Sequence, residues 1–202
     1  MKVYVASSWR NVHQPEVVQC LRSAGYTVYD FRNPHEHTLE REQGFRWTDI
    51  DPTWQSWTVE QFIAALEHPL AQDGFNSDFT NLREADAVVL VAPCGRSAHL
   101  ELGFAVGRNI PTIMLLDNGE PELMYKMATH LAINLDEVLS WLHFEAHRIG
   151  SLPESETQLM KLKAGDRVLI DLEMAQAHFN TAISQCCGRG YDQDDLHRLL
   201  RC

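Results

Sequence analysis

Short apolar runs alternate with longer amphipathic stretches along residues 1–150. Each apolar run is rich in β-branched residues and bounded by polar ones, which is typical of a strand. The predicted strands are Val3–Ala6, Tyr26–Phe31, Ala87–Ala92, Pro111–Leu116 and, with less apolar character, Leu131–Asn134. Strands that are apolar throughout and alternate with helices belong to sheets covered on both faces. The pattern therefore predicts an α/β fold with a parallel sheet flanked by helices.

The stretches between these runs carry the spacing and end signals of helices. In Pro15–Gly25 the apolar residues recur at helical intervals, with proline near the start and glycine at the end. Thr58 and Gln61 have capping-box spacing at the start of a second helix, Thr58–Ala71. Further helices are predicted over Asn76–Ala85, from near Ser97 onward, and over Leu135–Ile149.

Two regions lack this regular alternation. Arg32–Trp57 has no clear periodicity, and loops of that length are usually functional or disordered. Three of the five tryptophans, Trp47, Trp54 and Trp57, lie in it and favour an ordered loop. After Gly150 the chain becomes more polar, and residues 151–202 are predicted to form a helical C-terminal extension of unassigned role, packed on the 1–150 α/β domain or on a partner subunit.

Composition narrows the possible partners. The 202 residues carry a formal net charge of -11, which argues against a nucleic-acid polymer or an acidic membrane surface and favours a small molecule. The five cysteines are scattered without a C-x-x-C pair, so neither a disulfide framework nor a zinc ribbon is indicated. No signal peptide or membrane-spanning run is recognisable, and we expect a cytoplasmic protein.

The order of elements predicts where a ligand binds. In a flavodoxin-like (Rossmann-like) sheet of order 2-1-3-4-5, the crevice lies between the carboxyl ends of the first and third strands. That position brings Ser7–Arg10 beside Pro93–Glu101. Neither segment contains a P-loop or a G-x-G-x-x-G fingerprint, so the chemistry has to come from side chains.

Glu101 is the first candidate. It lies about one turn into the helix that starts near Ser97, and a capping box on Ser97 would need its acid at position 100, which is Leu100. With apolar neighbours such as Leu102, we expect this carboxyl to be partly desolvated yet kept ionised by the helix N-terminus, which suits a nucleophile. A simple dipole contact, worth about 0.3–1 kcal/mol, is the alternative.

Three segments carry a family resemblance: YVASSWRN, FNSDFTNLREADAVVLVAP and HLELGFAVGRNIPTIMLL. Over roughly residues 1–145 they resemble the nucleoside 2-deoxyribosyltransferase family, including its nucleotide N-hydrolase relatives, and E-L-G-F-A after a strand is the most specific element. The resemblance implies that Glu101 attacks the anomeric carbon, that Asp78 protonates the departing base, and that Tyr4 orients the nucleophile. Alternatively, Asp78 caps a helix after Asn76, and Tyr4 is a core aromatic.

The resemblance also implies a substrate site, and this chain departs from the family pattern in one loop of that site. Deoxyribosyltransferases carry an acid in the loop before the nucleophile, where this chain has Cys94–Ser97, whereas the nucleotide-hydrolysing relatives have serine and glycine there and bind a 5′-phosphate. The candidate substrate-binding residues are Ser7, Trp9, Arg10, Trp47, Asp49, Gly95, Arg96 and Ser97. In the long loop Trp47, Trp54, Trp57 and Asp49 would stack on and hydrogen-bond a base, although tryptophans also pin loops to a core. Ser97, the loop amides and Arg96 would supply an anion site for such a phosphate, although an exposed loop arginine is also often simply solvated.

No metal or organic cofactor is predicted. His35 with His37 and His143 with His147 lack the partners of a metal site, and Cys94 would need His99 to fold back as its base. The resemblance thus implies N-glycosidic bond cleavage or glycosyl transfer on a nucleoside or nucleotide, and also a homodimer or larger assembly. A dinucleotide glycohydrolase of the NAD type and a non-catalytic nucleotide sensor stay open as alternatives, as do the base, the sugar and the acceptor.

Overall fold

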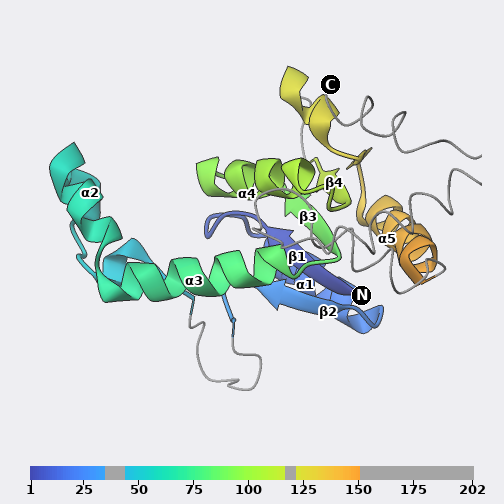
Figure 1. Ribbon diagram of the computed structural model, residues 1–202, viewed down its shortest axis with the longest axis horizontal. Coiled ribbons are helices and arrows are strands. Elements are labelled where there is room, and N and C mark those ends of the chain that lie inside the picture. The colour runs from blue at the N-terminus through green and yellow to red at the C-terminus, as the bar shows by residue number, and fades with distance from the viewer. Residues whose placement is uncertain (35–43, 117–121, 151–202) are drawn as a thin grey trace, which may run out of the picture. The chain divides into compact units, whose positions relative to one another are not determined.

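The computed structural model describes residues 1–34, 44–116 and 122–150. Within these ranges the sheet has five parallel strands in the order β2-β1-β3-β4-β5 (Figure 1). The strands are β1 Lys2–Ala6, β2 Thr27–Asp30, β3 Ala87–Val91, β4 Thr112–Leu115 and β5 His130–Ala132. The predicted fold class and strand order are confirmed. The predicted extension, residues 151–202, and the His35–His37 pair lie outside the described residues.

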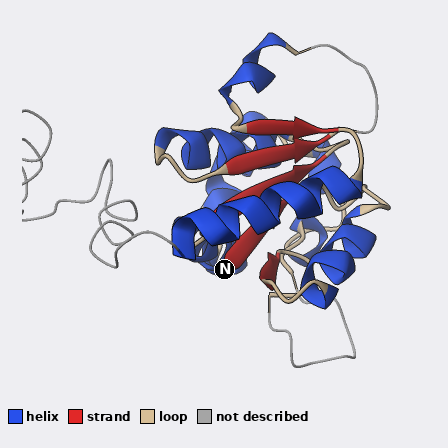
Figure 2. Ribbon diagram, turned by 90° about the vertical axis from the view of Figure 1, so that its right-hand side faces the viewer, coloured by secondary structure: helices blue, strands red, loops and turns tan. Residues whose placement is uncertain are grey.

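Helices cover both faces of the sheet (Figure 2). α1 (Gln14–Ser23) and α5 (Leu135–Gly150) pack on one face, which is lined by valines and isoleucine of the strands. α3 (Pro69–Arg83) and α4 (Arg96–Gly107) pack on the other. On that second face α4 buries Ala98, Leu102 and Ala105 at helical spacing against the strands.

Strand register decides which side chains meet on each face. β1 pairs with both β2 and β3, and Tyr4 lies level with Tyr29 on one side and Val88 on the other. Because successive side chains of a strand point to opposite faces, Tyr4 and Tyr29 share the face that α3 and α4 cover. Two aromatic hydroxyls are thereby placed beneath these two helices.

The predicted helix boundaries between residues 58 and 85 are wrong. The capping box of Thr58 and Gln61 is present and starts α2 (Val59–Leu66), but the chain breaks there and α3 begins at Pro69. Proline lacks the amide hydrogen of a helix interior and is favoured in a first turn, which explains the break. α3 then runs unbroken through Asp78, so the interpretation of Asp78 as a helix cap is also wrong.

The described part of the long loop is ordered by its aromatic residues. It contains two short 3-10 helices, η1 (Trp47–Asp49) and η2 (Trp54–Ser56). Trp47 packs edge-on against Trp57 and against Phe62 of α2, with ring centroids 5.8 Å apart in both pairs. The expectation of an ordered loop is confirmed for residues 44–57.

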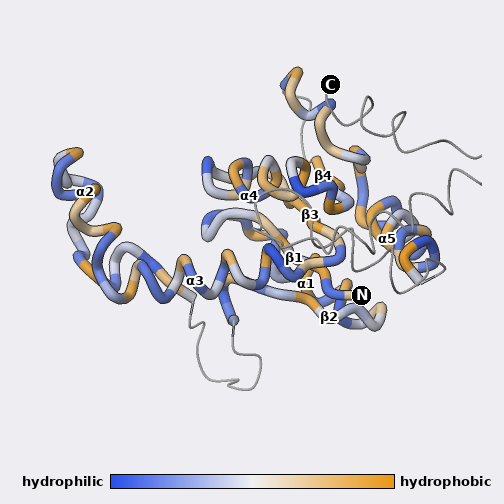
Figure 3. Tube along the Cα trace, viewed as in Figure 1, coloured by the Kyte–Doolittle hydropathy of each residue, from blue (hydrophilic) through white to orange (hydrophobic). Residues whose placement is uncertain are grey.

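α2 exposes an apolar surface. Val59, Phe62, Ile63 and Leu66, spaced as one helical face, are all exposed. In the hydropathy colouring of Figure 3, orange segments appear along α2. Among the described residues, none of the helices is both long and apolar enough to cross a membrane.

Candidate active site

Two carboxyls and two tyrosines meet on the face that α3 and α4 cover. Tyr4 and Tyr29 come from neighbouring strands, and their rings stack with centroids 5.3 Å apart and planes inclined by 19°. Asp78 comes from α3 and Glu101 from α4. The structure therefore brings together the three residues predicted to be catalytic and adds Tyr29, which sequence reasoning missed.

Tyr29 is bound directly to Asp78. Its hydroxyl donates to Asp78 Oδ1 over 2.8 Å and lies 3.0 Å from the Ser77 hydroxyl. The signal that points to Tyr29 is strand alternation combined with register, because a parallel pairing of Val3–Ala6 with the second strand sets Tyr29 beside Tyr4. Ser77 has no such signal in the sequence.

Burial raises the pKa of both carboxyls. The pKa of Asp78 rises to about 6 because the group is desolvated, an effect that the hydrogen bond from Tyr29 partly offsets. The pKa of Glu101 rises to about 7, first through desolvation and then through the negative charge of Asp78, while Tyr4 acts in the opposite direction. Both groups titrate close to neutral pH, which is where a general acid and its partner are most useful.

Partial desolvation of Glu101 is as expected, but the expectation that the helix N-terminus keeps it ionised is wrong. α4 begins at Arg96, so Glu101 lies in its second turn. The influence of the helix dipole falls off within the first turn, whereas burial and the neighbouring Asp78 act on Glu101 directly. A substantial share of Glu101 is therefore protonated at neutral pH.

The Tyr4 hydroxyl is the third polar group of the site. Tyr4 is 1% exposed, and its hydroxyl has no well-formed hydrogen bond to any of the residues that the structure describes. Burial raises the pKa of Tyr4 well above its ordinary value, and the charges of Glu101 and Asp78 raise it further. The Tyr4 hydroxyl also interacts with Glu101 and favours the ionised form of that carboxyl.

The carboxyl ends of β1 and β3 lie side by side, as predicted. The Ser7 hydroxyl donates to the Val91 carbonyl over 2.8 Å. The Asn11 side-chain amide donates to the Val91 and Pro93 carbonyls over 3.1 and 3.2 Å. The Ser7 hydrogen is thus used within the protein, and only the oxygen lone pairs of Ser7 are left for a substrate.

Arg32 holds the loop after β1 from the other side, and sequence reasoning did not identify it. Its Nη2 donates to the carbonyls of Ser8, Trp9 and Asn11 over 3.0, 3.0 and 2.7 Å. Arg32 is buried, and carbonyl contacts of this kind depend on tertiary structure, so the local sequence carries no signal for them. The predicted binding segment Ser7–Arg10 is therefore a fixed loop.

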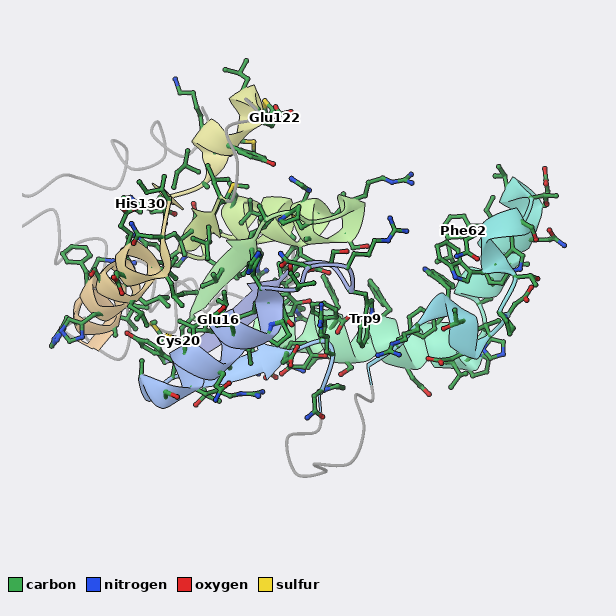
Figure 4. The ribbon with its side chains drawn as sticks, turned by 180° about the vertical axis from the view of Figure 1, so that it is seen from behind. Trp9, Glu16, Cys20, Phe62, Glu122 and His130 are labelled. Carbon is green, nitrogen blue, oxygen red and sulfur yellow. The ribbon has the colours of Figure 1, made fainter. Side chains whose placement is uncertain are left out.

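Trp9 joins that loop to residues 44–47. The indole Nε1 donates to the Phe45 carbonyl over 3.2 Å, and the Arg46 guanidinium lies 4.1 Å from the centre of the indole ring. Figure 4 labels Trp9, and in it Phe62 projects from α2. Arg10, the next residue of the predicted site, is exposed.

The remaining predicted binding residues are at the surface or in the aromatic loop. Trp47 contacts Phe45 as well as Trp57 and Phe62, as a tryptophan that pins a loop does, and its role in binding a base stays a prediction. Asp49 is exposed and accepts a hydrogen bond from the Arg46 amide over 3.0 Å.

Gly95, Arg96 and Ser97 form the start of α4 and are all exposed. Gly95 occupies the cap position, and no side chain caps the helix amides there. An anion site at this end stays a prediction.

The structure brings Cys94 and His99 together. His99 Nδ1 lies 3.7 Å from Cys94 Sγ and 2.9 Å from the Gly95 carbonyl, and His99 Nε2 lies 3.0 Å from the Tyr125 hydroxyl. Because a carbonyl only accepts, Nδ1 carries the hydrogen and is not a base for the thiol.

His143 and His147 place their Nε2 atoms 3.0 Å apart on α5. Within the described ranges, no group of three or more histidine, cysteine, aspartate or glutamate side chains could hold a metal ion.

The fold and site define a doubly wound α/β domain with a carboxyl pair set above a tyrosine pair. No protein-family model and no curated protein sequence matches the chain. A solved structure of a 2-deoxyribosyltransferase from the psychrotolerant bacterium Bacillus psychrosaccharolyticus is similar at 20% identity, with a TM-score of 0.47, over 69% of this chain and 90% of that one. A conserved protein from Enterococcus faecalis V583 is similar at 13% identity, with a TM-score of 0.42, over 69% and 95%.

Proposed function

We propose that this domain breaks the N-glycosidic bond of a nucleoside or nucleotide, with Glu101 as nucleophile and Asp78 as general acid. One observation carries the proposal: Glu101 and Asp78, on different helices, interact with each other and with the buried Tyr4 hydroxyl, and the pKa of each carboxyl is raised toward neutrality. The sequence motifs around Tyr4, Asp78 and Glu101 independently point to the same chemistry.

The reaction proceeds in two displacements at the anomeric carbon. An oxygen of Glu101 attacks that carbon, the carbon–nitrogen bond breaks with its electron pair leaving on the base, and the proton of Asp78 passes to the base nitrogen. A glycosyl ester of Glu101 results. Water or a second base then attacks the same carbon, gives its proton to Asp78 and releases Glu101, so both groups regain their starting forms.

The number of protons that Glu101 and Asp78 hold between them suits this reaction. Attack needs Glu101 ionised and Asp78 protonated, which is one proton shared between two carboxyls. With pKa values of about 6 for Asp78 and about 7 for Glu101, the pair holds one proton near neutral pH. Its two ionisations belong to the coupled pair, so a bound substrate can shift the proton from Glu101 to Asp78 without uptake from solvent.

The finer features of the function belong to the same proposal. The loop Ser7–Arg10 and the start of α4 at Gly95–Ser97 would bind the sugar or its phosphate, and Trp47 with Asp49 the base. We further propose a cytoplasmic protein that works as a homodimer or larger assembly, and the rate of sedimentation tests the latter directly.

The test is turnover of a mixed pool of deoxynucleosides, ribonucleosides, their monophosphates and NAD, followed by chromatography with and without an added free base. Wild type, Glu101→Gln and the control Glu16→Gln, which changes an exposed glutamate of α1, are compared. We expect one class of substrate to be consumed by wild type and by the control, and not by Glu101→Gln. Exchange onto the added base identifies a transferase, and its absence a hydrolase.

Other outcomes decide the alternatives. Equal turnover by Glu101→Gln and wild type would contradict the nucleophile assignment. Nicotinamide released from NAD would establish the dinucleotide glycohydrolase. Binding of a pool member by equilibrium dialysis, with no turnover by any of the proteins, would establish the nucleotide sensor, which the loop without an acid at Cys94–Ser97 favours.

A further inference from the structure

The hydroxyl of Tyr29 has little freedom to move. Its side chain is 6% exposed, and its ring is stacked on Tyr4 from the neighbouring strand. Burial raises the pKa of Tyr29 above its ordinary value, and the negative charge of Asp78 raises it further. The hydroxyl therefore keeps its hydrogen at neutral pH, and the stacking on Tyr4 restricts the direction in which it points.

The hydrogen of Tyr29 is used on Asp78. The phenol donates to Asp78 Oδ1 over 2.8 Å, and its one hydrogen is then spent. The Ser77 hydroxyl, 3.0 Å away, must consequently donate to the phenolic oxygen. A directed chain of hydrogen bonds runs from Ser77 through Tyr29 to Asp78.

This chain makes the two oxygens of Asp78 different. Oδ1 accepts from Tyr29, so a proton carried by Asp78 is placed on Oδ2. A carboxyl held through one oxygen also cannot rotate freely, and Oδ2 keeps one direction. The charged and titratable groups that face this arrangement are Glu101 from α4, Tyr4 from β1 and Asp30 from β2.

We propose that Tyr29 is a positioning residue which, supported by Ser77, holds Asp78 so that its proton resides on Oδ2 and is delivered to the leaving base from there. The inference rests on the proposed function of Asp78 as general acid. It assigns to Tyr29 a contribution to leaving-group protonation and none to attack by Glu101.

The first test needs no turnover. Carbon-13 carboxyl spectra are titrated with pH for wild type, Tyr29→Phe and the control Tyr26→Phe, which makes the same change in a half-buried tyrosine packed on the opposite face of the sheet. The hydrogen bond from Tyr29 favours the ionised form, so its removal should raise the apparent pKa of Asp78 in Tyr29→Phe and leave it unchanged in Tyr26→Phe. An unchanged titration in Tyr29→Phe would overturn the proposal.

The second test separates positioning from general damage to the fold. An ordinary nucleoside needs its base protonated, whereas an N7-methylated purine nucleoside already carries a positive base that leaves as a neutral molecule. We expect Tyr29→Phe to lower kcat by about tenfold to a hundredfold on the first substrate, with a small change in KM, and by far less on the second. Asp78→Asn should show the same selective loss, and Ser77→Ala a weaker one.

The outcomes keep the two proposals apart. Equal losses on both substrates, or no loss on either, would overturn the role of Tyr29 while leaving the glycosidic chemistry intact. Absence of turnover by wild type on every nucleoside would overturn the proposed function, and the carboxyl titration would then still decide whether Tyr29 holds Asp78. Thermal unfolding of Tyr29→Phe checks that the retained ring preserves the stack with Tyr4.

Discussion

Tyr4 and Tyr29 stack at paired positions of β1 and β2, with their ring centroids 5.3 Å apart. The contact is set by strand register, because a shift of one residue would turn one ring to the opposite face of the sheet. Through it the Tyr4 hydroxyl near Glu101 and the Tyr29 hydroxyl on Asp78 are held on the same face of the sheet. The pairing of the edge strand β2 with β1 thus decides the geometry of the proposed acid and nucleophile.

The rate should depend on pH in the way that a shared proton requires. We expect kcat/KM to be bell-shaped, falling below about pH 6 as the pair gains a second proton and above about pH 7 as it loses the last one. Asp78→Asn should lower the rate by about a hundredfold or more and remove the alkaline limb, since only ionisation of Glu101 then remains. A bell unchanged by Asp78→Asn would show that other groups titrate.

The same two carboxyls should make the folded state less stable as the pH rises. The folded-state pKa of Asp78 is raised from 3.8 to about 6 and that of Glu101 from 4.5 to about 7. Groups raised in this way contribute stability that is complete below their unfolded values and is lost as the pH passes the folded values. We expect the pair to lower the free energy of unfolding by a few kcal/mol, on the order of the summed shifts, between pH 4 and 8.

Urea unfolding at a series of pH values measures this loss. The variant Asp78→Asn with Glu101→Gln replaces both carboxyls by amides, and the difference between wild type and this variant isolates their contribution from that of the other titrating groups. The difference should move steadily in favour of the variant as the pH increases. A difference that does not depend on pH would mean that the carboxyls are well solvated.

Loss of Arg32 should destabilise the loop after β1. Arg32→Gln removes the guanidinium donors to the carbonyls of Ser8, Trp9 and Asn11, of which the contact with Asn11 is buried and the other two are part-buried. We expect the free energy of unfolding to fall by about 2–4 kcal/mol, with faster amide exchange in residues 8–11. Arg10→Ala, an exposed arginine of the same loop, should change stability by less than about 0.5 kcal/mol. Equal effects of the two would contradict the anchoring role.

Replacing two helical glycines by alanine should change the stability of the protein in opposite directions. An alanine at Gly74 of α3 would place its Cβ 2.6 Å from the Cβ of Phe45, so one backbone has to move. At Gly103 of α4 no described atom lies within 4 Å of such a Cβ. We expect Gly74→Ala to cost about 1–2 kcal/mol and Gly103→Ala to add up to about 1 kcal/mol of helix stability, measured by thermal unfolding.

The periodicity of the sequence predicted the strands, and their order followed from taking the common order of flavodoxin-like sheets. It did not predict where α2 ends, because Pro69 sits inside a stretch whose apolar residues continue at helical spacing. The three residues Tyr4, Asp78 and Glu101 were grouped by their motifs, and the structure sets them on one face.

What the sequence could not supply is tertiary in origin. The charge state of Glu101 depends on burial and on a carboxyl more than 20 positions away, neither of which the local pattern shows. In the sequence alone, Tyr29 is indistinguishable from any other aromatic residue of a strand, because its position beside Tyr4 depends on the strand register. Arg32 reads as a loop residue until the path of the chain brings three carbonyls to it.

α3 connects the site with a distant part of the domain. It runs without a break from Pro69 to Arg83, and about 13 Å of rigid helix separates its first residue from Asp78. Its outer portion, at Gly74, lies against Phe45 of the aromatic loop. Because α3 is one continuous helix, a displacement of its outer portion would also shift Asp78 relative to Glu101 on α4.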